Sequence, residues 1–255
     1  MKYIFRLGVA ALTICLAVLP SALQAVEINS VDLDRDQDGL SNLDETTKYF
    51  TDPDQADTDG DGYPDGEEIA YGYSPRYKIT RLVDVDSDSD GLNDAWELIL
   101  GTGLMNPDTD RDGHNDGTEV FEGYDPLNKE PVKVEKKIKV SATELRLRYY
   151  FGDRELESIP VSTGKEATPT PPGDFKVLQK IPVKDYIGPT WNYPDVKWSL
   201  YFTRARGYRY YIHGAYWHNK FGTAPVSGGC VNVRYADMER LYAFAQVGTS
   251  IFIGE

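Results

Sequence analysis

The most regularly spaced acidic side chains lie in four 12-residue segments of the N-terminal half. The segments are DRDQDGLSNLDE (34–45), DTDGDGYPDGEE (57–68), DSDSDGLNDAWE (86–97) and DTDRDGHNDGTE (108–119). Each has Asp at positions 1, 3 and 5, Gly at position 6, Asp or Asn at position 9 and Glu at position 12. Calcium prefers about six to eight oxygen ligands in a flexible cage, which alternate Asp residues and a closing Glu can supply. The spacing therefore predicts four calcium-binding loops.

The predicted ligands take the same positions in every loop, and the glycine at position 6 permits the sharp turn between them. Side-chain oxygens are expected from Asp34, Asp36, Asp38, Asn42, Glu45, Asp57, Asp59, Asp61, Asp65, Glu68, Asp86, Asp88, Asp90, Asp94, Glu97, Asp108, Asp110, Asp112, Asp116 and Glu119. Main-chain carbonyls are expected at position 7, from Leu40, Tyr63, Leu92 and His114. The predicted cofactor is thus structural calcium, at about four sites.

The charge of the surrounding region also points to bound cations. Residues 26–128 contain 28 acidic and 6 basic side chains, and the whole chain has a net charge of −14. A region of this composition repels itself, so it is either a disordered acidic linker or is ordered by cations. We expect chelation to unfold this region and to leave the C-terminal half folded. The acidic balance argues against nucleic acid as a partner.

The loops differ from ordinary EF-hands. Only 11 residues separate Glu45 from Asp57, too few for one helix leaving a loop and another entering the next. Over residues 32–126, the spacing and connectors such as TDPDQADTDGDG resemble bacterial thrombospondin type 3 repeats. The resemblance implies a calcium-ordered stalk or adaptor with short helices, such as one at 93–101. A thin core is expected from Leu43, Phe50, Ile69, Trp96, Leu98, Ile99, Val120 and Phe121.

A thiol and an imidazole in the C-terminal half are the second candidate for chemistry. Cys230 is the one cysteine left after removal of a leader that contains Cys15, and it follows a glycine-rich turn at 227–229. His213 lies 17 residues before it and can activate the thiol by accepting its proton. The N–H groups of Gly229 and Cys230 can then bind an oxyanion. The alternative is a buried structural cysteine and an ordinary core histidine.

Alternating apolar and polar residues indicate the elements that must position this pair. We expect a hairpin at 144–164, strands at 175–183, 198–202, 209–214 and 249–253, and one helix at 235–246. The segment KEPVKVEKKIKV (129–140) looks like a charged joint. The predicted fold class is a mostly β (α+β) domain preceded by an irregular module of calcium loops with short helices.

The stretch IHGAYWHNKFG…SGGCVNVR…GTSIFI resembles the active-site motif of the L,D-transpeptidase catalytic domain, with similarity over residues 136–255. The resemblance implies acyl transfer from peptidoglycan stem peptides through a Cys230 thioester, with His213 as base and no catalytic cofactor. Ser227, Gly229, Cys230 and Asn232 match the motif, whereas Gly228 replaces the usual histidine. The catalytic residues are then Cys230, His213 and Gly229, and the candidate substrate contacts are Tyr216, Trp217, Ser227, Asn232 and Arg234. His218 takes a structural or substrate-facing role.

The N-terminus predicts export. Residues 1–25 combine a positive start, an apolar run at 7–19 and a plausible cleavage site, which is typical of a secretory signal peptide. The apolar run is too short to span a membrane comfortably, so no span is expected after cleavage. The predicted organisation is a signal peptide (1–25), calcium repeats (26–128), a linker (129–135) and the catalytic domain (136–255), located in the periplasm or cell envelope.

Several functions remain open. A transpeptidase would cross-link or remodel the cell wall and so influence cell shape. Water as acceptor would make the enzyme a carboxypeptidase or hydrolase, and a protein lysine would make it an anchoring enzyme. A calcium-dependent envelope adhesin or scaffold with an inactive catalytic fold is the alternative outside enzymes. An envelope protein is a possible partner of the calcium module.

Overall fold

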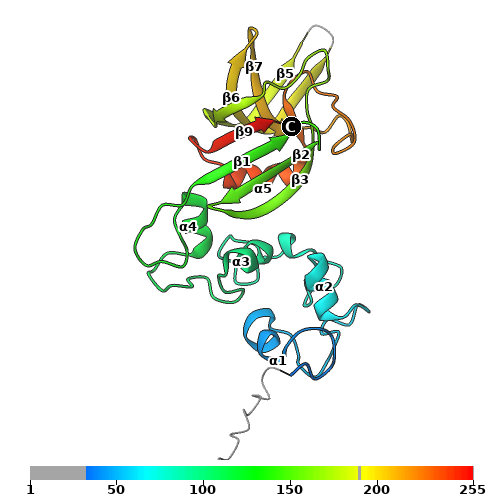
Figure 1. Ribbon diagram of the computed structural model, residues 1–255, viewed down its shortest axis with the longest axis vertical. Coiled ribbons are helices and arrows are strands. Elements are labelled where there is room, and N and C mark those ends of the chain that lie inside the picture. Colours follow the sequence, from blue (N-terminus) through cyan, green and yellow to red (C-terminus); the bar gives the residue numbers. More distant parts are fainter. Residues whose placement is uncertain (1–32, 189–190, 255) are drawn as a thin grey trace, which may run out of the picture.

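The computed structural model describes residues 33–188 and 191–254. The predicted signal peptide and Cys15 lie outside the described residues. Within those ranges, no helix is both long and apolar enough to cross a membrane. A β-sheet domain forms the C-terminal half, and the N-terminal helices extend from one end of it (Figure 1).

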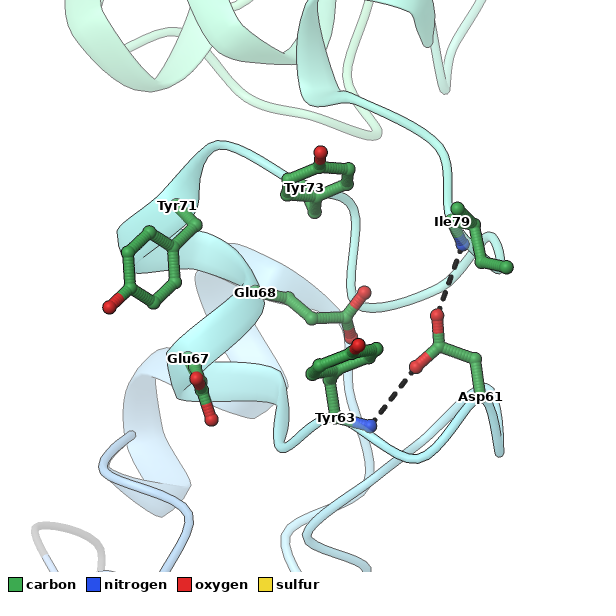
Figure 2. A pocket seen from close by; sticks show the side chains of 7 residues that line it. All are labelled: Asp61, Tyr63, Glu67, Glu68, Tyr71, Tyr73 and Ile79. Atoms are coloured by element: carbon green, nitrogen blue, oxygen red, sulfur yellow. Dashed lines mark hydrogen bonds between the residues drawn. The ribbon is translucent and has the colours of Figure 1, made fainter.

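Each acidic loop leads into a short helix. The helices are α1 (Asn42–Asp44), continued by the π-helical turn η2 (Glu45–Tyr49), then α2 (Asp65–Tyr71), α3 (Asp94–Leu100) and α4 (Asp116–Glu122), with a 3-10 turn η3 (Leu82–Asp84) before the third loop. Helices α1 to α4 each begin at loop position 9. The position-12 Glu is the fourth residue of α2, α3 and α4, as Figure 2 shows for Glu68 on α2, and it is the first residue of η2 in the first loop. Glycines in the left-handed conformation end α2, α3 and α4. The helix expected at 93–101 is confirmed.

The C-terminal half forms one mixed sheet. Its strands are β1 (Lys136–Ser141), β2 (Arg146–Phe151), β3 (Arg154–Ser162), β4 (Gly173–Lys176), β5 (Gln179–Ile187), β6 (Asn192–Ala205), β7 (Tyr208–Gly214), β8 (Val231–Val233) and β9 (Ser250–Gly254), and its helix is α5 (Tyr235–Phe244). The strand order is β4-β9-β1-β2-β3-β8-β7-β6-β5, and the pairs β1–β9 and β7–β8 are parallel. The mostly β fold class is confirmed.

Two local expectations differ from the structure. Residues 129–140 are not all joint, because β1 begins at Lys136 and pairs with β2 and β9. Ile138 and Val140 alternate into the core, and the buried Lys136 donates to main-chain carbonyls of Phe121 and Phe244. The strand expected at 175–183 is divided between β4 and β5, because the chain changes partner there from β9 to β6.

The expected thin core beneath the ions is wrong in part. Trp96 and Val120 are buried, but Leu43, Phe50 and Ile99 are more than one third exposed. The buried residues Leu92, Trp96, Leu100 and Val120 belong to one hydrophobic cluster with residues of the β domain, among them Tyr149 and Phe244. A four-residue spacing places the first three on one face, and this face packs on the sheet domain.

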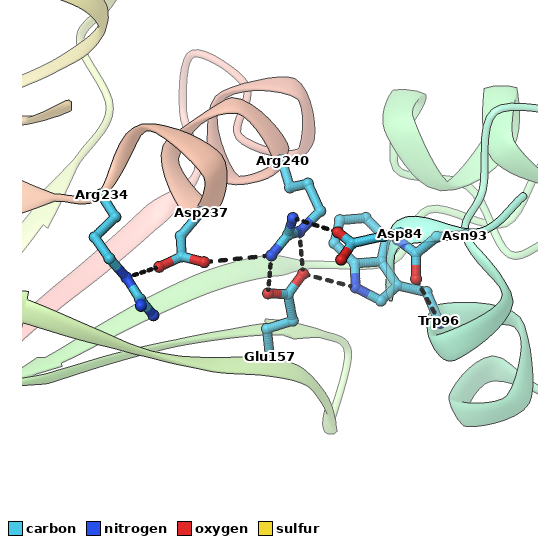
Figure 3. A network of polar contacts seen from close by, with 7 residues as sticks. All are labelled: Asp84, Asn93, Trp96, Glu157, Arg234, Asp237 and Arg240. Atoms are coloured by element: carbon cyan, nitrogen blue, oxygen red, sulfur yellow. Dashed lines mark hydrogen bonds and ion pairs between the residues drawn. The ribbon is translucent and has the colours of Figure 1, made fainter. Parts of the chain in front are cut away.

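Polar contacts reinforce this packing (Figure 3). Arg240 of α5 donates from Nε and Nη2 to the Glu157 carboxylate of β3, at 3.0 and 3.2 Å. The indole Nε1 of Trp96 donates to the same carboxylate at 3.1 Å. Arg240 also reaches Asp84 before the third loop at 3.4 Å. The third loop and its helix are therefore fixed to α5 and β3.

The four loops associate as two pairs. In the first loop pair (34–71), a Cβ at Gly66 would lie 2.4 Å from the Asp38 carbonyl oxygen. In the second loop pair (86–122), a Cβ at Gly117 would lie 2.7 Å from the Asp90 carbonyl oxygen, and the Gly117 N–H donates to Asp90 at 2.8 Å. Only glycine permits these approaches, so position 10 of the second and fourth loops sets the pairing.

Candidate functional site

His213 and Cys230 lie on neighbouring parts of the sheet. Strands β7 and β8 are parallel, with His213 opposite Asn232 and Ile212 opposite Val231. Residues opposite one another point to the same face, and alternate residues return to that face. His213 and Asn232 share one face, whereas Ile212 and Val231 pack in the core, and Cys230 lies in the bend immediately before β8.

A directed chain of hydrogen bonds sets the tautomer of His213. Its Nδ1 lies 2.9 Å from the carbonyl oxygen of Gly214, which can only accept, so Nδ1 carries the proton. Nε2 then accepts from the Asn232 amide at 3.1 Å. The Asn232 oxygen accepts from His218 Nε2 at 3.1 Å, and His218 Nδ1 accepts from the Lys220 N–H. His218 thus orients Asn232, which the sequence alone does not reveal.

Burial keeps both reactive groups neutral. It lowers the pKa of His213 to about 4, against a smaller opposing effect of the main-chain hydrogen bond. It raises the pKa of the Cys230 thiol to about 11, opposed by a main-chain hydrogen bond from Tyr211 and the charge of Lys184. Among the described residues, no hydrogen bond joins the sulfur to His213, whose Nε2 lone pair faces Asn232. Proton transfer to His213 Nε2 therefore requires that the hydrogen bond from the Asn232 amide be broken first.

The turn before Cys230 is held by its own side chains and tight packing. Ser227 Oγ donates to the Cys230 carbonyl and accepts the Gly229 N–H, the latter at 3.0 Å. Gly229 has a φ of 121°, and a Cβ there would lie 2.7 Å from the Tyr210 ring, so only glycine fits. The Gly229 N–H, expected to face an oxyanion, is here donated to Ser227. At Gly228, by contrast, a Cβ would meet nothing within 4 Å.

The remaining predicted substrate contacts divide into two groups. Trp217 lies 5.8 Å from the His213 ring, centroid to centroid, and stacks on a tyrosine of β6 at 3.9 Å. Tyr216 is 51% exposed beside it. Arg234 instead pairs through Nε with Asp237 at 2.9 Å, within the network that faces the third loop (Figure 3). Trp217 therefore lies near His213, with Tyr216 beside it, whereas Arg234 is paired with Asp237.

The acidic loops contain buried carboxylate oxygens with no hydrogen-bond partner. They occur at positions 3 and 12 of every loop, in Asp36, Glu45, Asp59, Glu68, Asp88, Glu97, Asp110 and Glu119. In each loop, the Asp residues at positions 1, 3 and 5 bring oxygens within 4.8 Å of one another. Burial and the neighbouring Asp carboxylates raise the pKa of Glu97 to about 9 and that of Glu68 to about 8. Such a donor set fits a hard divalent cation.

The position-9 side chains accept hydrogen bonds within their own loops. Asp65, Asp94 and Asp116 accept from the N–H and hydroxyl of Thr58, Ser87 and Thr109 at position 2, and Asn42 accepts from the Arg35 N–H. These bonds tie the ends of each loop. Asp65 also has an oxygen within 4.8 Å of ligand oxygens of Asp38 and Glu45. The second loop therefore adds a carboxylate to the donor set of the first.

Each half of the chain contains a match to a known protein family. Residues 135–253 match the model of the L,D-transpeptidase catalytic domain. The C-terminal half is an L,D-transpeptidase catalytic domain. Residues 57–72 and 86–102 match the bacterial TSP3 repeat, so both resemblances in the sequence are confirmed. A Bacillus licheniformis protein, provisionally named L,D-transpeptidase YkuD, is 28% identical over 125 residues, which cover 49% of this chain and 69% of that protein.

Solved structures of transpeptidases are also similar. An L,D-transpeptidase from Mycobacterium smegmatis is 27% identical with a TM-score of 0.43, and the match covers 48% of this chain and 59% of that one. An L,D-transpeptidase from Mycobacterium tuberculosis H37Rv is 23% identical with a TM-score of 0.44, and the match covers 49% of this chain and 59% of that one. This chain thus spans less than two thirds of either structure.

Strand β5 contributes residues to the candidate site that sequence reasoning missed. The Tyr186 ring stacks on His213 with centroids 4.3 Å apart, and its hydroxyl lies 3.0 Å from Ser199 Oγ. Lys184, two residues earlier, is near enough to Cys230 to lower its pKa. Lys184 Nζ lies 5.0 Å from the centroid of the Tyr186 ring, so the two side chains are on one face although the strand register shifts between them. No sequence signal shows that this face lies over β7, because β5 pairs with β6.

Proposed function

We propose that this protein is an exported cysteine L,D-transpeptidase acting on peptidoglycan stem peptides. The observation that carries the proposal is the pairing of His213 on β7 with Asn232 on β8, two residues after Cys230, with the Asn232 amide hydrogen-bonded to His213 Nε2. The tautomer of His213 presents the Nε2 lone pair toward Asn232. A thiol beside an imidazole of fixed tautomer is suited to nucleophilic acyl transfer.

The reaction proceeds in two acyl transfers. The Cys230 sulfur attacks the carbonyl carbon after the third residue of a stem tetrapeptide, and His213 Nε2 takes the thiol proton. The bond to the terminal D-alanine then breaks, and His213 returns the proton to the leaving amine. An amine of a neighbouring stem attacks the thioester, gives its proton to His213, and leaves a new amide while the thiol is restored.

The neutral resting pair implies that proton transfer accompanies attack. Because the sulfur and the ring are both neutral, no preformed thiolate is needed, and Asn232 yields the Nε2 lone pair as substrate enters. The Cys230 N–H is the first oxyanion donor, and Gly229 becomes the second if Ser227 releases it. Losing one such donor typically lowers the rate about 10²- to 10³-fold. Tyr216 and Trp217 contact the stem peptide.

The acidic loops bind calcium in this proposal, at about four sites. In each loop the Asp residues at positions 1, 3 and 5, the position-7 carbonyl and the position-12 Glu hold the ion. The unpaired buried oxygens at positions 3 and 12 support this assignment. With residues 1–25 as signal peptide, residues 26–128 form the calcium module and residues 136–255 the catalytic domain, in the periplasm or cell envelope.

The test is product analysis by mass spectrometry. Calcium-loaded protein is incubated with a disaccharide tetrapeptide, and a cross-linked dimer with loss of D-alanine is expected. Cys230→Ser abolishes the dimer, and His213→Asn slows it about 10²- to 10⁴-fold. Arg234→Gln is the matched control, expected to retain turnover because Arg234 is paired with Asp237.

Other products identify the alternatives. Free tripeptide without dimer indicates a carboxypeptidase, and a protein conjugate indicates an anchoring enzyme. A folded protein that leaves the substrate intact contradicts the enzymatic assignment and favours an envelope scaffold or adhesin.

A further inference from the structure

A cavity of about 340 Å³ lies beside the second acidic loop, outside the catalytic half (Figure 2). Three tyrosines, Tyr63, Tyr71 and Tyr73, line it together with Ile79. Its volume falls within the range of roughly 300–1,000 Å³ that is usual for ligand sites. None of these four side chains has a part in the proposed transpeptidase reaction or supplies a side-chain oxygen to calcium.

The apolar surface of this cavity is unusually open to solvent. Tyr71 is 74% and Ile79 is 78% exposed. Ile79 also has a φ of 53°, a left-handed conformation that is unfavourable for a β-branched residue. Its N–H donates to Asp61 Oδ2 at 3.1 Å, which holds this conformation (Figure 2). A contiguous exposed apolar surface of this kind is typical of a binding site.

The polar lining of the cavity is acidic. Asp61, Glu67 and Glu68 complete its wall, and the lining includes no Lys, Arg, Asn or Gln. Glu68 is 4% exposed, and its Oε2 has no hydrogen-bond partner. Tyrosine ring faces carry negative electrostatic potential, which adds to that of the carboxylates. With Asp61 and Glu68 assigned to calcium, the tyrosine ring faces and Glu67 still give the cavity a negative potential, which suits a cation.

Other tyrosines of the N-terminal half have a lysine ammonium group of this chain over the ring. Lys48 Nζ lies 4.8 Å from the ring centroid of Tyr49, and Lys133 Nζ lies 3.4 Å from that of Tyr124. Within residues 33–188 and 191–254, no lysine or arginine lies in this way over the three tyrosines of the cavity. The ring faces in the cavity are thus left for a cation from outside the chain.

We propose that this cavity binds a lysine or arginine side chain of a partner polypeptide. The methylene stem packs against the tyrosine rings, and the charged head lies between ring faces and Glu67. The acidic surroundings at 26–128 steer such a basic segment toward the cavity. Asp61 and Glu68 are also ligands of the second loop in the proposed function, so bound calcium keeps this wall ordered.

The test measures fluorescence anisotropy of a labelled hexalysine peptide with the full chain, in millimolar calcium and physiological salt. The same peptide with every lysine acetylated is the neutral control. The double variant Tyr63→Ala/Tyr71→Ala is expected to raise the Kd for hexalysine about tenfold, because two cation–π contacts are lost without a change of charge. Tyr77→Ala is the matched control, since Tyr77 is exposed but outside the cavity, and it is expected to leave the Kd unchanged.

The charge contribution is tested separately. Glu67→Gln is expected to weaken binding about threefold or more, whereas Glu130→Gln, an exposed change of the same charge, has little effect. Equal affinity in all variants would mean diffuse electrostatic attraction and would overturn the proposal. Binding of a chitooligosaccharide that is lost in the tyrosine variant, without specific hexalysine binding, would overturn it in favour of a saccharide site. Calcium titration of the same double variant shows whether its calcium site is intact. A change in hexalysine binding can then be distinguished from failure of the calcium site.

Discussion

The two loop pairs have the same ligand pattern but different surroundings. The first pair leaves Leu43 and Phe50 exposed, and its helices α1 and α2 lie away from the sheet (Figure 1). The second pair buries Trp96 and Val120 in the core of the β domain, and α3 and α4 lie beside that domain (Figure 1). A repeated sequence motif thus lies outside the main hydrophobic cluster in one place and forms part of the core of the β domain in the other.

This difference changes what calcium is expected to control. Trp96 contacts Phe244 of α5, with ring centroids 5.9 Å apart, and α5 packs against β6 and β7. Tyr235 at the start of α5 fills the space beside Gly214, whose carbonyl holds the His213 tautomer. The expectation that chelation unfolds the whole acidic region and leaves the C-terminal half unaffected is therefore revised. Chelation should unfold the first pair, whereas the second pair should remain attached to the sheet domain and the loss of its ions should weaken that domain. The predictions below test this division.

The largest expected effect follows from Trp96→Ala. Removing a buried ring that packs on Tyr149 and Phe244 should lower the free energy of unfolding by about 3–5 kcal/mol. Urea denaturation followed by circular dichroism measures the change. Phe50→Ala in the first pair is the control, with an expected change below about 1 kcal/mol because that ring is half-exposed. Equal losses in both variants would mean that the two pairs are attached alike.

The pH dependence of the calcium-free protein is the next effect. The pKa of Glu97 is raised to about 9 by burial and neighbouring carboxylates, so the folded state holds this proton more tightly than the unfolded state. The resulting stabilisation is complete below the unfolded pKa of about 4.5 and is lost as pH rises toward 9. Thermal melts should show lower stability at pH 8 than at pH 6 without calcium. Calcium should stabilise more at pH 8, and a flat profile in both conditions would contradict this linkage.

Removing one position-12 ligand distinguishes the pairs. Glu97→Gln and Glu45→Gln each remove a buried ligand charge, and a lost site is worth about 1.4 kcal/mol when calcium is ten times its Kd. Hydrogen exchange should show the loss spreading from Glu97→Gln into α5 and β3. The loss from Glu45→Gln should remain within residues 34–71. Similar exchange of the β domain in the two variants would remove the distinction.

The smallest effect is expected at the polar network. Arg240→Met breaks the pairing with Glu157 and should lower stability by about 1 kcal/mol, because the Trp96 indole N–H still donates to the Glu157 carboxylate. Chemical denaturation with the Arg240/Glu157 double-mutant cycle measures this coupling. Arg148→Met breaks a more exposed pair with Glu144 and is expected to change little. A coupling energy near zero between Arg240 and Glu157 would mean that only the aromatic cluster attaches the second loop pair to the β domain.

The clustering of the loop carboxylates could be predicted from sequence because these residues lie within 12 consecutive positions. The hydrogen bonds of the position-9 side chains to position 2 could not be predicted, because the same oxygens can also serve as metal ligands. The packing of Trp96 on the β domain could not be predicted, because its aromatic partners Tyr149 and Phe244 lie in β2 and α5, far away in the sequence. The same holds for Lys136, whose side chain looks like that of an exposed strand but caps two buried carbonyls.

For the candidate catalytic pair, the sequence motif singles out the two residues but does not show their arrangement. The placement of His213 opposite Asn232, two residues after Cys230, depends on parallel pairing between β7 and β8, which are separated along the chain. The roles of His218 and Tyr186 depend on the same long-range packing. Local patterns do not encode such contacts, because loop closure and strand order decide them.

The most direct test of the account is to trap the acyl-enzyme. The calcium-loaded protein is mixed with stem tetrapeptide in the absence of an acceptor amine, quenched in acid, and mapped by peptide mass spectrometry. The account predicts a tripeptidyl thioester on Cys230 with release of D-alanine, formed at least about 10²-fold more slowly in His213→Asn. An adduct on another residue, or one that forms equally fast without the imidazole, would contradict it.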